Sequence, residues 1–336
     1  MLLQASLPRH GPGLPIEVDP GQGRSTARTP PNLSRFIWCV SARDQLALAL
    51  LSVLVFTAGV APLELQRRIV NDAFVGGASG PIIRLALVYA GLAVLAGLLK
   101  LGLNIYRGYV GESATRWLRT ALLDDFRQIR PELCQAATEG VEVSLVVDEA
   151  DPIGGFVGTS VSEPLLQGGL LIGVLAYMVY LQPLMALVAL AVFSPQLVFV
   201  PLMQSAINRR VAYRIATLRQ VSVGIIDQPR AGAATDSPQQ EHIQQVFAVN
   251  MGVIRLKFSM NFLMNLMHHL GIAAILALGG YYVVKGTAEV GTIVAFVSGL
   301  GQLNEPWGDL VNWFRDLKVT QTKYDLISRA VESLRA

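Results

Sequence analysis

The sequence predicts an all-α integral membrane protein with six transmembrane helices and long cytoplasmic helical extensions. Three observations support this fold class: six apolar stretches of membrane-spanning length, little charge, and basic residues gathered on one side of the stretches. Hydrophobic residues make up 52% of the chain and charged residues 15%, against about 25% charged residues in ordinary soluble domains. We therefore expect the lipid bilayer to surround much of the chain.

The apolar stretches define the expected spans. A helix needs about 20 mostly apolar residues to cross the hydrocarbon core, and a backbone in lipid must satisfy its own hydrogen bonds, which favours helices over strands. The expected spans are residues 46–63, 81–99, 164–181, 183–203, 258–284 and 290–303. Pro195 and Pro201 in the fourth span either kink it or are tolerated because neighbouring groups satisfy the freed backbone.

The basic residues predict the orientation. If both termini are cytoplasmic, 22 of the 27 Lys and Arg residues lie inside and 4 outside, with Lys100 at the inner end of the second span. Cytoplasmic loops carry such an excess, so we expect cytoplasmic termini and a location in a bacterial inner membrane. Cys39 and Cys134 then share the cytoplasmic side, where a structural disulfide is not expected. The net charge of +3 is small and dispersed, which gives no support for nucleic-acid binding.

The first 35 residues differ from the rest. They contain six prolines and too little apolar surface to form a core. We expect a disordered cytoplasmic tail over residues 1–35, followed by an interfacial helix that starts at Phe36 and places Trp38 at headgroup level. The alternative is that this stretch is only a linker.

The connections between spans are unequal in length. The outer ones are short, about residues 182–183 and 285–289, whereas the inner ones, about residues 102–163 and 204–257, are long. Long structureless loops are uncommon in compact proteins, and Trp117, Leu118 and Leu122 recur at helical spacing. We expect the helices to continue into the cytoplasm as hairpins, where an arm of 20 residues would project about 30 Å.

Several segments of this chain resemble segments of a known protein family. Residues 279–286 are GGYYVVKG, residues 289–296 are EVGTIVAF and residues 310–313 are LVNW. Residues 144–153 (SLVVDEADPI) and 180–187 (YLQPLMAL) add further similarity. Together they resemble the transmembrane domain of ABC exporters, the ABC transmembrane type-1 module, over about residues 36–329. In that family an ATP-binding domain normally follows, here after residues 330–336.

The resemblance implies a membrane subunit that transmits the ATP-driven motion of a separate ATP-binding subunit to substrate translocation. It also implies a second transmembrane subunit, identical or different, and ATP with Mg bound by a partner rather than by this chain. A phosphate-binding loop needs a Lys, and the nearest match, residues 286–292, has Thr there. We therefore expect no ATPase site. Alternatives are a non-transporting relic or regulatory subunit, a truncated product, or an ion-gradient-driven carrier.

Two sets of residues are candidates for function. By the resemblance, Asp148, Glu149, Asp151 and Pro152 form the first coupling segment and dock on the ATP-binding subunit, with Pro152 ending or turning the local helix. Three carboxylates favour a basic groove, although a solvated acidic turn explains them equally. The second coupling segment is expected near residues 221–228, and residues 228–240 interrupt the helical pattern with Pro and Gly.

The second set lies in the fifth span. Asn261 and Asn265 share a helix face with His268 or His269, and polar groups within the membrane commonly face a bundle interior or an aqueous cavity. They are candidates for a substrate path. The alternative is hydrogen bonding between helices. A metal site on the two histidines is less favoured, because adjacent residues point about 100° apart on a helix.

Overall fold

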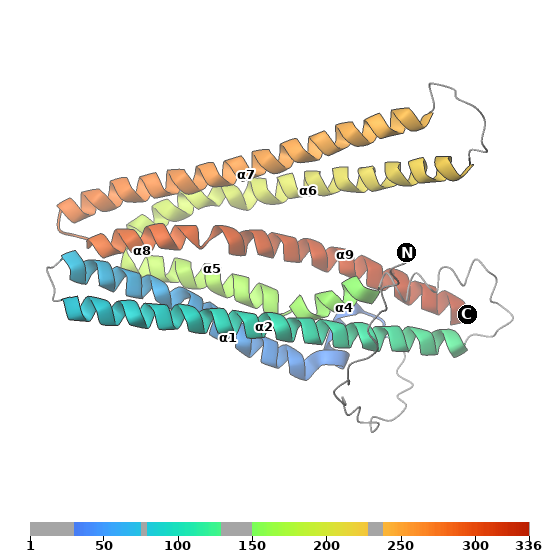
Figure 1. Ribbon diagram of the computed structural model, residues 1–336, viewed down its shortest axis with the longest axis horizontal. Helices are drawn as coiled ribbons and strands as arrows, with labels where there is room; N and C mark the ends of the chain where they lie inside the picture. Colours follow the sequence, from blue (N-terminus) through green and yellow to red (C-terminus); the bar gives the residue numbers. More distant parts are fainter. Residues whose placement is uncertain (1–29, 75–78, 129–149, 228–237, 336) are drawn as a thin grey trace, which may run out of the picture.

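The computed structural model describes residues 30–74, 79–128, 150–227 and 238–335. In these ranges all regular elements are helices, as the sequence predicts, and they run along one elongated bundle (Figure 1). Their bounds are α1 (Leu33–Phe74), α2 (Ser79–Gln128), α4 (Ala150–Thr159), α5 (Ser162–Leu181), α6 (Pro183–Asp227), α7 (Pro238–Val284), α8 (Val290–Gly301) and α9 (Asn304–Arg335).

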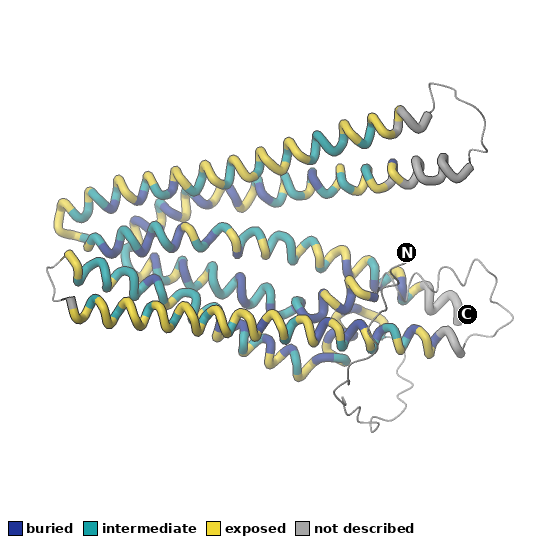
Figure 2. The backbone as a smooth tube through the Cα atoms, in the orientation of Figure 1, coloured by how far each residue is buried: buried dark blue, intermediate teal, exposed yellow. Residues whose placement is uncertain are grey.

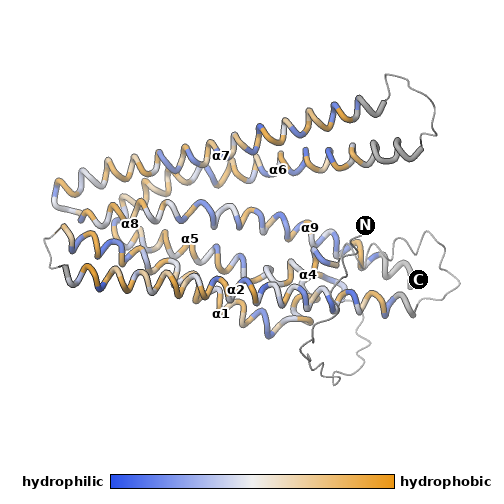
Figure 3. Tube along the Cα trace, in the orientation of Figure 1, coloured by the Kyte–Doolittle hydropathy of each residue, from blue (hydrophilic) through white to orange (hydrophobic). Residues whose placement is uncertain are grey.

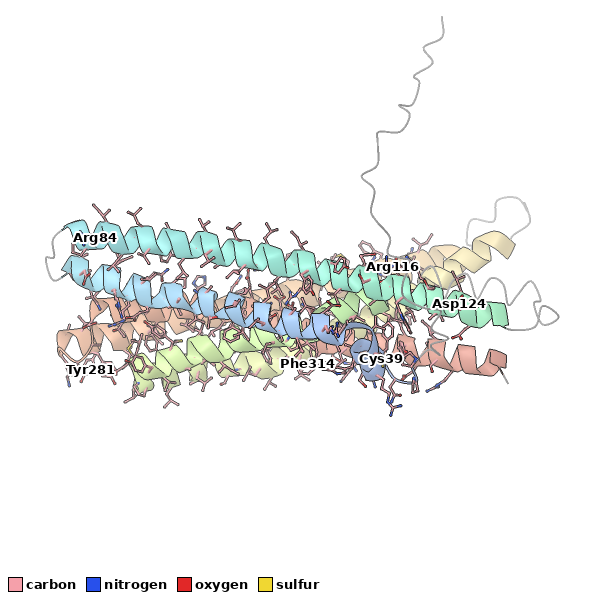
Figure 4. The ribbon with its side chains drawn as sticks, turned by 90° about the horizontal axis from the view of Figure 1, so that it is seen from below. Cys39, Arg84, Arg116, Asp124, Tyr281 and Phe314 are labelled. Carbon is pink, nitrogen blue, oxygen red and sulfur yellow. The ribbon has the colours of Figure 1, made fainter. Side chains whose placement is uncertain are left out.

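The bundle has two different ends. At one end, here called the short-turn end, Gln182 alone separates α5 from α6 and residues 285–289 join α7 to α8, as expected. Gly286 in the second turn has a φ of 73°, a conformation that side-chain-bearing residues rarely adopt. The opposite end, here called the arm end, receives the far ends of α2, α6 and α7. Arg84 and Tyr281 lie at the short-turn end, and Arg116 and Asp124 lie toward the arm end (Figure 4).

Five helices in the described part of the chain are long and apolar enough to cross a membrane. The predicted sixth span, about residues 290–303, corresponds to α8 and the turn that follows it, since α8 has 12 residues and ends at Gly301. Helix α9 then begins at Asn304, after a turn in which the Gln302 N–H donates to the Ser298 and Gly299 carbonyls. Pro306 has no N–H to continue a helix through this point.

The helical arms are confirmed for α2, α6 and α7, which contain 50, 45 and 47 residues. At 1.5 Å per residue each is about 70 Å long, more than twice the hydrocarbon thickness of about 30 Å. Along α2 the residues change from mostly hydrophobic near the short-turn end to mixed near the arm end (Figure 3). Helix α6 contains both Pro195 and Pro201 and continues past them to Asp227.

The N-terminal helix begins at Leu33, three residues before the predicted start, and residues 1–29 lie outside the described part. Helical geometry breaks at Ser41 (φ −138°, ψ 25°), so a short first helix precedes the span. Phe36 in this helix is fully buried, with ring centroids 5.6 Å from Trp117 and 5.4 Å from Tyr324. This first described helix is thereby packed against both α2 and α9.

Two apolar cores hold the bundle together. The first joins α1, α2, α4, α5 and α9, and the second joins α1 with α5, α6, α7 and α8. Helices α6 and α7 pack on each other and meet the others near the short-turn end, then diverge from α9 toward the arm end (Figure 1). Much of the surface of α2, α6 and α7 is exposed (Figure 2).

Candidate functional site

Helices α2 and α4 are in unusually close contact where the first arm meets the rest of the bundle. A Cβ on Gly154 would collide with the Thr115 side chain and lie 2.7 Å from the Thr115 nitrogen, and one on Gly158 would collide with the Arg107 carbonyl oxygen. Gly111 on α2 faces the same crossing, where an added Cβ would lie 3.3 Å from the Gly154 carbonyl oxygen. Small residues permit such approach between helices, so α2 and α4 are fitted together as one unit.

The first coupling segment lies beside this crossing. Asp148 and Glu149 are outside the described residues. Asp151 lies in the first turn of α4, is exposed, and pairs with Arg119 of α2 at 2.7 Å. Such exposed ion pairs are worth only about 0–1 kcal/mol, so the Asp151 carboxylate can exchange partners.

Pro152 has a different position from the one predicted. It lies in the first turn of α4, which begins at Ala150, so it starts a helix instead of ending or turning one. The reason is that the first turn of a helix has no internal partner for its N–H groups, and Pro lacks that group.

The second coupling segment is only partly described. Helix α6 continues to Asp227 and α7 begins at Pro238, so Pro238 opens a helix instead of interrupting one. Residues 228–237, where most of the predicted interruption falls, lie outside the described part.

A polar cluster that the sequence analysis did not identify joins α2, α5 and α9. Arg107 Nη1 pairs with Glu163 Oε2 at 2.6 Å, with side chains only 11% and 18% exposed, and Arg107 Nε donates to Ser162 Oγ at 2.8 Å. Gln167 Nε2 donates to Glu163 at 2.8 Å and to Asp309 at 2.9 Å. Hydrogen-bonded charges therefore connect the α2 arm to α5 and α9.

The surroundings of Asp309 in this cluster disfavour its charged form. Burial and the carboxylates of Glu163 and Glu305 raise the pKa of Asp309, which Lys100 and Arg107 only partly oppose. The available sequence signal was the pair of charged residues, Arg107 and Glu163, close to apolar spans, since charges near the membrane interior usually have partners.

The polar residues of α7 divide between two faces. Asn261, Asn265 and His269 follow each other at intervals of four and are exposed, whereas His268 is partly buried. The structure thus places His269 with the two asparagines, and no element among the described residues covers this stripe. The two imidazole ring centroids are 5.5 Å apart and inclined at 61°.

His268 instead faces the seam between α6 and α7. A Cβ on Gly271 would approach Val192, and one on Gly279 would approach Met185, so the antiparallel register places His268 level with Gln196. Gln196 is 1% exposed, and both Gln196 Oε1 and His268 Nδ1 are buried without a hydrogen-bond partner among the described residues. Gln196 is a polar residue of this region that periodicity alone did not single out.

Comparison with known proteins agrees with this architecture. The model of the ABC transporter transmembrane region matches residues 36–214. The chain is 21% identical over 332 residues to the uncharacterized ABC transporter ATP-binding protein YfiC of Bacillus subtilis, covering 94% of this chain and 55% of that protein. It is 26% identical over 222 residues to the ATP-dependent lipid A-core flippase of Syntrophus aciditrophicus, covering 62% of this chain and 36% of the flippase. The chain thus spans about half the length or less of these relatives. The family model covers more than half of the chain, which therefore belongs to the ABC transporter transmembrane region family.

Proposed function

We propose that this chain is the membrane-spanning subunit of an ABC-type exporter and transmits ATP-driven motion of a separate ATP-binding subunit to substrate translocation. The observation that carries the proposal is the set of arms: α2, α6 and α7 leave the membrane region as uninterrupted helices toward the same end (Figure 1). A helix that is continuous from a docking surface into the membrane transmits displacement without a flexible link.

The first arm is suited to this task. Displacement of the Asp151 region would move α4, and the close glycine contacts of Gly154 and Gly158 make α2 move with it. The Arg107–Glu163 ion pair then passes the displacement to α5. Alternation of access between the two sides of a membrane requires rocking of such packed units.

The surface of the other arm supports the proposal of a second membrane subunit. Apolar side chains along α6 and α7 beyond the expected spans are exposed: Tyr213 56%, Ile215 45%, Ile243 58%, Phe247 66% and Ile254 44%. Large exposed apolar surfaces mark interaction sites. We assign this surface, and the stripe of Asn261, Asn265 and His269, to the side that faces the partner subunit and the substrate path between the two.

The excess of basic residues toward the arm end supports a cytoplasmic position for that end, and we propose that the chain lies in a bacterial inner membrane. ATP and Mg bind to the partner subunit, and this chain, with its membrane domain over residues 36–329, supplies no nucleotide site. Outward transport is favoured by similarity to a protein named as a flippase.

The test is to purify the tagged chain from native membranes with its ATP-binding subunit and reconstitute the complex in vesicles. The joint variant Asp148→Ala, Glu149→Ala and Asp151→Ala should keep membrane insertion but lose most of the substrate-dependent ATPase activity. The matched control is Asp316→Ala, which removes an exposed carboxylate of α9 that pairs with the adjacent Arg315. Undiminished coupling in the joint variant, or the absence of any associated ATP-binding subunit, would contradict the proposal.

A further inference from the structure

At the short-turn end, polar side chains tie α1 to the start of α8. Arg67 Nη1 pairs with Glu289 Oε2 at 2.9 Å. Asn71 Nδ2 donates to the same carboxylate, while Asn71 Oδ1 accepts from the Gly291 backbone N–H at 2.7 Å. A Cβ on Gly291 would collide with the Arg67 carbonyl oxygen and the Asn71 side chain, so the first turn of α8 lies directly on α1.

A second carboxylate holds Arg67 in position for this contact. Glu64 accepts from Arg67 Nε at 2.9 Å and from Arg67 Nη2 at 3.0 Å. Tyr177 of α5 donates to Glu64 at 2.6 Å. Because Glu64 occupies one edge of the guanidinium, Nη1 is directed at Glu289. Three helices from distant parts of the chain thus meet in one network of charge-assisted hydrogen bonds, which are stronger than neutral ones.

The network is nevertheless accessible to water. The Arg67 side chain is 23% exposed and that of Glu289 61% exposed. Water can rehydrate Glu289 when the contact opens, so separation leaves no buried unpaired charge, and pairs of this kind contribute about 1 kcal/mol or less. A contact with these properties has a specific geometry, but breaking it requires little free energy.

The two ends of the bundle differ in how closely the helices lie together. The helices converge at the short-turn end, where this network lies, whereas α6 and α7 diverge from α9 at the arm end (Figure 1). In this conformation α1 and the start of α8 are therefore held together at the short-turn end, and separating them requires this network to break.

We propose that Arg67, Asn71 and Glu289 form a latch that holds the short-turn end closed and is released when the transporter opens to that side. Glu64 and Tyr177 are positioning residues that aim Arg67. The inference rests on the alternation of access in the proposed function, but the latch itself is a property of this chain and acts without ATP.

The test measures the distance between the outer ends of α1 and α8 in the full chain in lipid nanodiscs. Spin labels are attached at Ala73→Cys and Thr287→Cys, both exposed positions, after the natural cysteines are replaced by Ser. Glu289→Gln, nearly equal in shape, and Asn71→Ala should each raise the ratio of separated to closed ends about fivefold, the factor for one hydrogen bond of about 1 kcal/mol.

The matched control is Arg68→Gln. Arg68 also pairs with Glu64, at 2.6 Å, but within α1, so its loss leaves the contact with α8 intact and the distance distribution unchanged. Raising the salt concentration should increase separation in the parent chain and have little effect in Glu289→Gln, because screening acts on exposed charges.

Unchanged distances in Glu289→Gln and Asn71→Ala, equal separation in Arg68→Gln, or a salt effect that survives Glu289→Gln would each overturn the latch. None of these results depends on an ATP-binding subunit, so failure of the latch is distinguishable from failure of the proposed function.

Discussion

Replacement of Gly158 by Ala tests whether α2 and α4 form one unit. The new Cβ would collide with the Arg107 carbonyl oxygen and lie 3.1 Å from the Arg107 carbonyl carbon and 3.3 Å from the Gly111 nitrogen. All three are backbone atoms, so no side-chain rotation relieves the overlap and the helices must separate by roughly 1 Å. Overpacking of this kind lowers the free energy of unfolding by about 1–3 kcal/mol, and we expect about 3 kcal/mol because backbone must move. The higher helix propensity of alanine offsets about 1 kcal/mol of this loss.

The matched control is Gly155→Ala, three residues earlier on α4. Gly155 is exposed and a Cβ there would meet nothing within 4 Å. Gly155→Ala should therefore raise the free energy of unfolding by up to about 1 kcal/mol through helix propensity. Thermal unfolding of both variants in the same detergent should give a clearly lower midpoint for Gly158→Ala than for the parent chain and a midpoint at or above the parent for Gly155→Ala. If Gly158→Ala unfolds at the same temperature as Gly155→Ala, the close contact does not hold α2 against α4.

Three further results are expected. Burial raises the pKa of Tyr324, whose hydroxyl donates to the Pro30 carbonyl at 2.6 Å. Because the pKa in the folded chain exceeds the unfolded value of about 10, the protonated hydroxyl stabilises the fold fully below about pH 10, and this stabilisation is lost as the pH rises above it. In Tyr324→Phe the free energy of unfolding should therefore fall less steeply than in the parent chain as the pH rises from about 9 to about 11. Glu163→Gln leaves Arg107 buried without its counter-charge and should destabilise the chain by about 3 kcal/mol in denaturant unfolding; an unchanged midpoint would mean the pair is hydrated. A thiol-reactive, membrane-impermeant reagent should label Thr287→Cys in intact cells but not Gln321→Cys, and the opposite pattern would invert the proposed orientation.

The sequence predicted those parts of the fold that depend on local composition. Apolar stretches and prolines determine where helices cross lipid and where they begin, which is why the turns at Gln182 and at residues 285–289 were located correctly. The helical arms were also predicted, because apolar residues recur at helical spacing beyond the spans. The predicted sixth span ended at residue 303, which coincides with the break before Asn304, and the missing N–H of Pro306 is consistent with a break there.

The pairings within the site could not be predicted in the same way. Periodicity indicates that one face of a helix is buried, but it does not indicate which helix covers it. Arg107 with Glu163 and Asn71 with Glu289 are pairs far apart in the sequence, and each residue taken alone resembles an ordinary charged or polar residue at the end of a span. The stripe of Asn261 and Asn265 could be recognised because its members follow each other on a single helix.

The two kinds of helix contact have different consequences for movement. At Gly154 and Gly158 backbone meets backbone, and the energy of such a contact rises steeply with displacement, since packed interiors have little free volume. At Arg67 and Glu289 long side chains meet in water, and the energy lost on separation is largely returned by hydration. A displacement applied to the α2–α4 unit is therefore not absorbed locally within that unit. If the proposed latch is correct, such a displacement opens the bundle at the exposed charges of the short-turn end, where separation leaves no buried charge unpaired.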